Sequence, residues 1–165
     1  MLSPKHIYVV DEIFRDITTF GSLFFALVLA GVLLILGQFA LLWKLVVGVI
    51  FTFTVTLLIR LCYFKKRPEA QAYHNLFGKI DASSFPSLHT ARVVFMALTF
   101  GFFFHQLLAS ILLVLLAGLV VYSRIYLHKH DWIDILGGAV LGVMTYGIVT
   151  YFLAGVILTI INFFF

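Results

Sequence analysis

Residues 84–121 read SFPSLHTARVVFMALTFGFFFHQLLASILLVLLAGLVV, and this segment decides the fold class. No Asp, Glu, Lys or Arg lies between Arg92 and Arg124. A helix needs about 20 residues to cross a bilayer, so this uncharged run is too long for one crossing. His105 and Gln106 form its natural turn. The segment therefore predicts two membrane-spanning helices, one starting near Pro86 and one ending near Val121.

The composition of the whole chain supports a membrane protein. Hydrophobic residues make up 63% of the 165 residues and charged residues 11%, whereas charged residues make up about a quarter of a soluble domain. No Pro-, Gly- or Ser-rich linker and no internal repeat divides the sequence, which predicts one domain over residues 1–165. The single cysteine, Cys62, excludes an intrachain disulfide and is interpreted as a packing residue.

Other apolar runs predict the remaining helices. Spans are expected at residues 20–36 and 41–63, with a turn at Gly37 between them. A polar loop follows over residues 64–84. The last span is expected over residues 135–154, followed by a bend or an interfacial tail. With the central pair, these runs predict an all-α, polytopic transmembrane bundle of about five spans. Residues 1–16 mix charged and apolar positions with a helical period, so an N-terminal amphipathic helix is expected at the interface.

Three short polar islands interrupt this apolar chain. They are Arg60-x6-Arg67-Pro68, Ser84-Phe85-Pro86-Ser87-Leu88-His89-Thr90 and Ser123-Arg124-x5-His130-x3-Asp134. Five spans place all three islands on the same side of the membrane. A channel or transporter would more naturally hold its ionisable residues near the midplane. Clustering at one end instead favours chemistry at the membrane surface.

The residue types in the islands fit phosphoryl transfer through a histidine nucleophile. His130 and Asp134 are four residues apart, so on a helix they share a face and the carboxylate can orient the imidazole. Arg67 and Arg124 are the best phosphate clamps, because a guanidinium binds phosphate through two hydrogen bonds. Arg60 joins them, or instead extends to the interface as a span-end arginine. Because every island adjoins a long apolar run, the expected substrate is a lipid.

The start of the central helix also suits a phosphate. Ser83 or Ser84 is expected to cap this helix, with Pro86 in its first turn. Ser87 would then place a hydroxyl beside free backbone N–H groups, and a helix N-terminus of this kind attracts phosphate. Arg92, one turn after His89, either touches the head group or extends toward the interface.

Together the islands resemble the signature of the type 2 phosphatidic acid phosphatase (PAP2) superfamily of integral membrane lipid phosphatases. That signature is Lys-x6-Arg-Pro, then Pro-Ser-Gly-His, then Ser-Arg-x5-His-x3-Asp. The match covers residues 60–134 and departs from the pattern at two positions, where Arg60 replaces lysine and Leu88 replaces glycine. Because three independent spacings agree, a chance match of one short motif does not explain the resemblance.

The resemblance implies hydrolysis of a phosphomonoester or pyrophosphate head group through a phosphohistidine. His130 would attack phosphorus, Asp134 would orient it, and His89 would protonate the departing oxygen and later activate water. The implied phosphate-binding residues are Arg60, Arg67, Ser87, Leu88 and Arg124. Two other functions stay open. Pro-Ser-Leu-His also resembles the inositol-phosphorylceramide synthase branch, which transfers a phosphoryl-linked group to a lipid alcohol, and a non-catalytic membrane transporter or binder would show no turnover.

No metal and no cofactor are expected, since the sequence has no His-Glu-x-x-His motif, no acidic cluster and no Gly-x-x-x-x-Gly-Lys loop. The expected partners are a phosphorylated lipid and the surrounding membrane lipids, toward which the net charge of +4 is attractive. Nucleic acid is not an expected partner, and oligomeric state is left open.

The expected location is the cell membrane. Basic residues on the site side point that face toward the cytoplasm by the positive-inside rule, but lipid-binding charges bias this count, and the resemblance favours an extracytoplasmic site.

Overall fold

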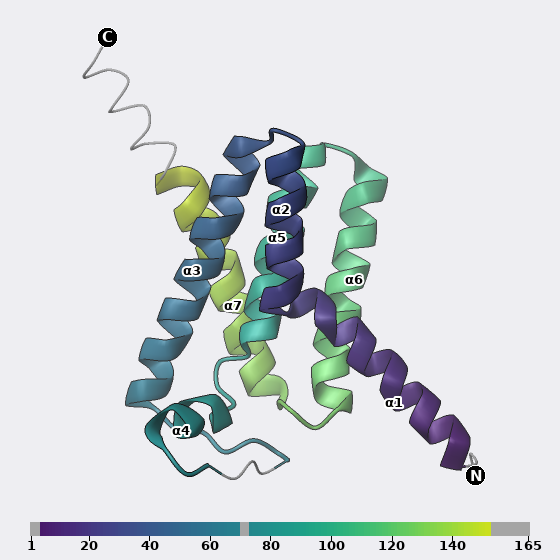
Figure 1. Cartoon of the computed structure of the whole chain (residues 1–165), viewed down its shortest axis with the longest axis vertical. Helices are drawn as coiled ribbons and strands as arrows, with labels where there is room; N and C mark the ends of the chain where they lie inside the picture. Colours follow the sequence, from purple (N-terminus) through teal and green to yellow (C-terminus); the bar gives the residue numbers. More distant parts are fainter. Residues whose placement is uncertain (1–3, 70–72, 153–165) are drawn as a thin grey trace.

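The computed structural model describes residues 4–69 and 73–152. Five helices lie side by side as a bundle (Figure 1): α2 (Leu23–Ile35), α3 (Phe39–Cys62), α5 (Leu88–Phe104), α6 (Leu107–Tyr126) and α7 (Trp132–Gly147). The short helix α4 (Leu76–Ala82) lies in the loop between α3 and α5. Across these described ranges the chain forms helices and loops, with one isolated antiparallel bridge between Lys66 and Ser83. The prediction of an all-α helical bundle is confirmed.

Three segments of the described chain are long and apolar enough to cross a membrane on their own: Phe39–Cys62, Leu107–Tyr126 and Trp132–Phe152. The last continues α7 through a π-helical turn, η2 (Ile148–Phe152). Helix α5 is apolar but has 17 residues, about 25 Å at 1.5 Å per residue. The expected tail after residue 154 lies outside the described residues.

The N-terminal helix α1 (Pro4–Thr18) leaves the bundle obliquely (Figure 1). It meets α2 at a bend of 52°, through the 3₁₀ turn η1 (Thr19–Gly21). Ser22 begins α2 by accepting a hydrogen bond from the Phe25 N–H at 3.1 Å. Helix α1 packs against α6, so the amphipathic segment is also part of the packed structure.

Helix ends follow local chemistry. Gly37 takes φ +67° in the turn between α2 and α3, where the absence of a Cβ removes the steric penalty. His105 ends α5 in the left-handed region, as the predicted turn requires. Helix α6 was expected to end near Val121 but continues to Tyr126, which places Ser123 and Arg124 in its last turns. Their burial against the bundle stabilises a helix that hydropathy alone would end earlier.

Helix α5 is the centre of the bundle, in contact with α3, α6 and α7. Phe95 of α5 is fully buried, and its ring lies against Gly48 of α3. On α7, Gly138 and Gly142 face the α5 backbone, where a Cβ would lie 2.5 Å from the Ser87 carbonyl oxygen and 2.6 Å from that of Ala91. Small residues spaced by four let helix backbones approach closely in a membrane. Gly138 and Gly142 therefore permit the close contact between α5 and α7, whereas a Cβ at Gly147 would have nothing within 4 Å.

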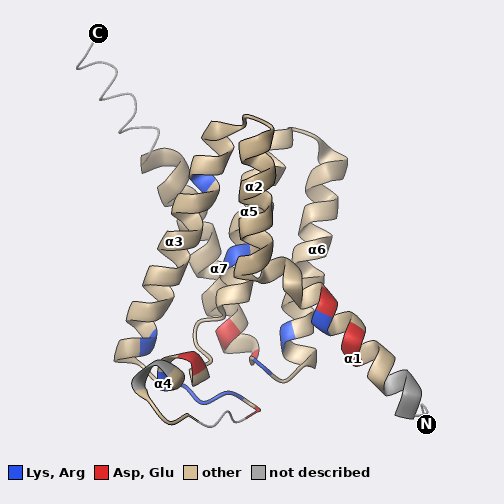
Figure 2. Cartoon of the chain, in the orientation of Figure 1, with Lys and Arg blue, Asp and Glu red and all other residues tan. Residues whose placement is uncertain are grey.

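Most charged residues of the bundle gather at one end (Figure 2). This end, at the bottom of the view, holds α4, the loop after α3 and the turn between α6 and α7. The three polar islands meet there. The loop that holds α4 keeps the first two islands at this end, and α5 and α6 carry the chain away and back to the third.

Candidate active site

A cavity of about 400 Å³ opens at the charged end of the bundle. It is lined by Arg60 from α3, Arg67 from the following loop, Leu88 and His89 from α5, Arg124 from α6, and His130 from the turn before α7, together with Asp81 and Lys129. The two other predicted site residues, Ser87 and Asp134, are fully buried and are not among the lining residues. Segments far apart in sequence thus supply one concentration of positive charge and two imidazoles.

His89 is placed by the first turn of α5. The capping residue is Ser87, not Ser83 or Ser84 as the sequence predicted: its Oγ accepts from the Thr90 N–H at 3.5 Å and from the Thr90 hydroxyl at 3.0 Å. Pro86 consequently precedes the helix. Ser84 instead fastens the chain to the loop after α3, because its N–H donates to the Lys65 carbonyl at 2.8 Å. This shift places His89 in the first turn of the helix, facing the cavity.

His130 lies just before α7, not on it. The expectation that His130 and Asp134 share a helix face is therefore wrong in its detail, because Asp131 is the N-cap and α7 begins at Trp132. The His130 N–H donates to the Arg124 carbonyl at 3.2 Å, which anchors the turn. The imidazole Nδ1 still lies 3.6 Å from Asp134 Oδ2, and both side chains are buried.

Burial lowers the pKa of His130 below its ordinary value, although the neighbouring Asp134 carboxylate acts in the opposite direction. The imidazole is therefore neutral near pH 7. Since Nδ1 faces Asp134, Nε2 is the nitrogen available to an electrophile.

The three arginines are held by different oxygens. Arg124 donates to the Thr18 hydroxyl of α1 at 3.0 Å, and Arg67 donates to the Asp81 carbonyl at 2.5 Å. Arg60 donates to the carbonyls of Pro86 and Ile80 at 3.1 and 3.4 Å, so its head group binds the backbone leading into α5. Arg92, whose role was left open, is buried and does not line this cavity.

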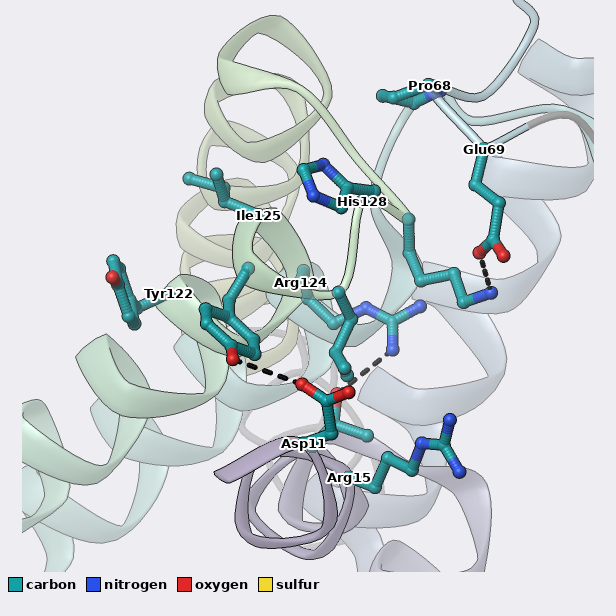
Figure 3. Close-up of a pocket in the computed structure, with 12 residues that line it drawn as sticks. Asp11, Arg15, Pro68, Glu69, Tyr122, Arg124, Ile125 and His128 are labelled. Atoms are coloured by element: carbon teal, nitrogen blue, oxygen red, sulfur yellow. Dashed lines mark hydrogen bonds and ion pairs between the residues drawn. The ribbon is translucent and has the colours of Figure 1, made fainter. Parts of the chain in front are cut away.

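A second cavity of about 1010 Å³ adjoins the first and shares Arg124 and Lys129 with it. It lies between α1 and the end of α6 (Figure 3). The Tyr126 hydroxyl donates to Asp11 at 3.0 Å, and Lys129 pairs with Glu69 across it. The position of α1 along one side of this space was not predictable from the sequence, because hydropathy does not report which helix α1 packs against.

Sequence reasoning missed Lys65, which lies in the expected polar loop over residues 64–84. Its ammonium group binds both Asp131 and Asp134 at the start of α7. Asp131 is both the cap of α7 and a partner of Lys65. Within the described part of the chain, no group of three or more His, Cys, Asp or Glu side chains is arranged to hold a metal ion.

Comparisons with known proteins identify a family and a fold. The family model of the PAP2 superfamily matches residues 41–157. The undecaprenyl-diphosphatase BcrC of Bacillus subtilis (strain 168) is 30% identical over 142 residues, which cover 84% of this chain and 72% of that protein. The crystal structure of LpxE from Aquifex aeolicus has the same fold, with a TM-score of 0.70 at 23% identity over 86% of this chain and 85% of that one. The chain therefore belongs to the PAP2 superfamily of membrane proteins.

Proposed function

We propose that this protein hydrolyses the phosphomonoester or diphosphate head group of a membrane lipid through a phosphohistidine on His130. The observation that carries the proposal is the shared cavity, in which two imidazoles and three guanidinium groups meet at one end of an apolar bundle. Family membership supports the same chemistry.

In the first step, His130 Nε2 attacks phosphorus. A nitrogen–phosphorus bond forms as the bond from phosphorus to the lipid-side oxygen breaks. His89 donates a proton to that departing oxygen. Asp134 Oδ2 lies 3.6 Å from Nδ1 of His130, where it can orient the ring and stabilise the positive charge that the ring acquires.

The arginines act on the phosphoryl oxygens. Arg67 and Arg124 line the cavity from two sides, where they can offset the negative charge that spreads over these oxygens in the transition state. In the second step, His89 accepts a proton from water, whose oxygen attacks phosphorus and releases phosphate from His130.

A polyprenyl diphosphate is the first substrate to test. The relative at 30% identity is named an undecaprenyl-diphosphatase, and the matched region spans most of both chains. The likeness to LpxE supports the fold alone.

The decisive experiment traps the covalent intermediate. Purified protein is mixed briefly with a ³²P-labelled polyprenyl diphosphate and quenched in alkali, where phosphohistidine survives. Wild type should carry label, and His130→Ala should carry none. His89→Ala should turn over slowly yet still be labelled by a substrate with a good leaving group, because such a group needs little protonation.

Two results would contradict the assignment. Label that maps to His89, or that survives in the His130→Ala variant, would reverse the two histidine roles. A wild-type protein that releases no phosphate from mono- or diphosphorylated lipids would instead favour a non-catalytic binder.

One observation keeps phosphotransfer to a lipid alcohol as the second candidate. Leu88, which stands where the family pattern has glycine, lines the catalytic cavity beside His89. An apolar wall there favours a lipid acceptor over bulk water. Product analysis separates the functions: free phosphate indicates hydrolysis, and a newly phosphorylated lipid alcohol indicates transfer.

We also propose that the protein lies in the cell membrane with this cavity on the extracytoplasmic side. A single reporter cysteine at the exposed position 66, in a Cys62→Ser background, tests this orientation. A membrane-impermeant maleimide should label it in intact cells. Labelling only after lysis would place the site in the cytoplasm.

A further inference from the structure

Lys65 connects the loop after α3 to the start of α7. Its Nζ lies 2.6 and 2.7 Å from the two carboxylate oxygens of Asp131 and 2.8 Å from Asp134 Oδ1. Asp134 is fully buried, and 20% of the Lys65 side chain is exposed. A buried carboxylate is stable as an ion only when it is paired and hydrogen-bonded. For Asp134, Lys65 supplies the pairing charge.

The same carboxylates are also fixed by the backbone. Asp131 Oδ1 accepts from the Asp134 N–H at 3.0 Å, and Asp134 Oδ2 accepts from the Asp131 N–H at 3.1 Å. Asp134 therefore has Oδ1 on Lys65 and Oδ2 toward the Asp131 N–H and His130 Nδ1. The carboxylate cannot rotate without breaking the contact with Lys65.

We propose that Lys65 is a positioning residue of the reaction, which fixes the Asp134 carboxylate and sets how much negative charge acts on His130. This inference rests on the proposed function, since it assigns Lys65 a role in the reactivity of the nucleophile. It extends that function, because Lys65 touches neither the cavity nor His130 and acts through Asp134.

The charge balance fixes the direction of the effect. The other charged or titratable groups that act on His130 or on Asp134 are Arg60, Arg67, His89, Arg124 and Asp131. Removing Lys65 takes away the cation that pairs with Asp131 and Asp134, and the Asp134 carboxylate lies beside the ring. The protonated imidazole is then stabilised, the pKa of His130 rises, and the neutral nucleophile is lost at a higher pH.

Removal of the Lys65 side chain leaves the attachment of the loop intact. The Lys65 carbonyl accepts from the Ser84 N–H at 2.8 Å, and its N–H donates to the Ser83 hydroxyl at 3.3 Å. Both contacts use the Lys65 backbone and remain in a Lys65→Met variant. The neighbouring Lys66 has an exposed side chain, so Lys66→Met is a matched control for loss of one positive charge from the same loop.

The test is the pH dependence of kcat/KM for phosphate release from a polyprenyl diphosphate in detergent micelles. Lys65→Met should lower kcat/KM at pH 7 at least tenfold and move the acid limb of the profile upward by about one pH unit. Lys65→Arg should recover part of the lost kcat/KM and part of the shift of the acid limb. Lys66→Met should match wild type in both. A Lys65→Met profile with an unmoved acid limb, whatever the rate, would overturn the proposal.

Asp131→Asn keeps the proposal testable even if Lys65→Met does not fold. Asparagine also caps helices, so α7 is retained while one negative charge is removed. The acid limb should then move downward in the single variant, and back toward wild type in Lys65→Met/Asp131→Asn. An Asp131→Asn profile whose acid limb does not move contradicts the inference. Absence of turnover in wild type contradicts the proposed function instead, so the two failures are distinguishable.

Discussion

The contact between α5 and α7 gives a prediction whose size follows from the structure. A Cβ at Gly138 would lie 2.5 Å from the Ser87 carbonyl oxygen and 3.0 Å from Thr90 Cβ. A backbone atom at that distance cannot move away without moving the start of α5. Overpacking of this kind costs about 1–3 kcal/mol, and the helix propensity of alanine returns at most about 1 kcal/mol. With that full gain, Gly138→Ala should lower the free energy of unfolding by up to about 2 kcal/mol.

The activity of the same variant should fall further than its stability suggests. Ser87 caps the helix that carries His89, so the strain acts on the position of the proposed proton donor. A displacement of about 1 Å can reduce the rate on the order of 100-fold. Gly142→Ala presses on Ala91 and Val94, one turn further from the cavity, and should lose similar stability but less kcat.

The assays are thermal unfolding in detergent and phosphate release at saturating substrate. For a chain of this size, 1 kcal/mol corresponds to about 2–4 °C in Tm. Gly118→Ala on α6 is the control, because nothing lies within 4 Å of its Cβ and its Tm should not fall. If Gly138→Ala matches Gly118→Ala in both Tm and kcat, the close approach of α5 and α7 does not position His89.

Two further predictions concern metal and pH. Phosphate release should persist in excess EDTA, because arginine side chains line the cavity and supply the positive charge that a metal would otherwise provide. Complete loss of activity that magnesium restores would contradict this mechanism. Burial lowers the pKa of His130 below the unfolded value of about 6.5, so the folded state favours the neutral ring. Its contribution to stability is fully present above about pH 6.5 and is lost as pH falls through the lowered folded pKa. The Tm of wild type should therefore fall relative to that of His130→Gln between pH 7 and pH 5, and a difference that does not change over this range would show that burial does not perturb His130.

The sequence by itself determined the fold class and which residues form the candidate site. Uninterrupted apolar runs identify the helices, because hydrocarbon accepts only segments whose backbone groups are satisfied internally. The turns at Gly37 and His105 were also predictable, since a break in an apolar run is a local property. The spacing of the islands predicted four residues that line the cavity: Arg67, His89, Arg124 and His130.

Only the tertiary structure decided how these residues are held. Ser87 caps α5 in place of Ser83 or Ser84, and His130 precedes α7, because caps depend on backbone angles that helix packing selects. The pairing of Lys65 with Asp134 joins residues 69 positions apart. Hydropathy and spacing are read along the chain, whereas the partner of a buried carboxylate is set by which loops the packed helices bring to the same end of the bundle.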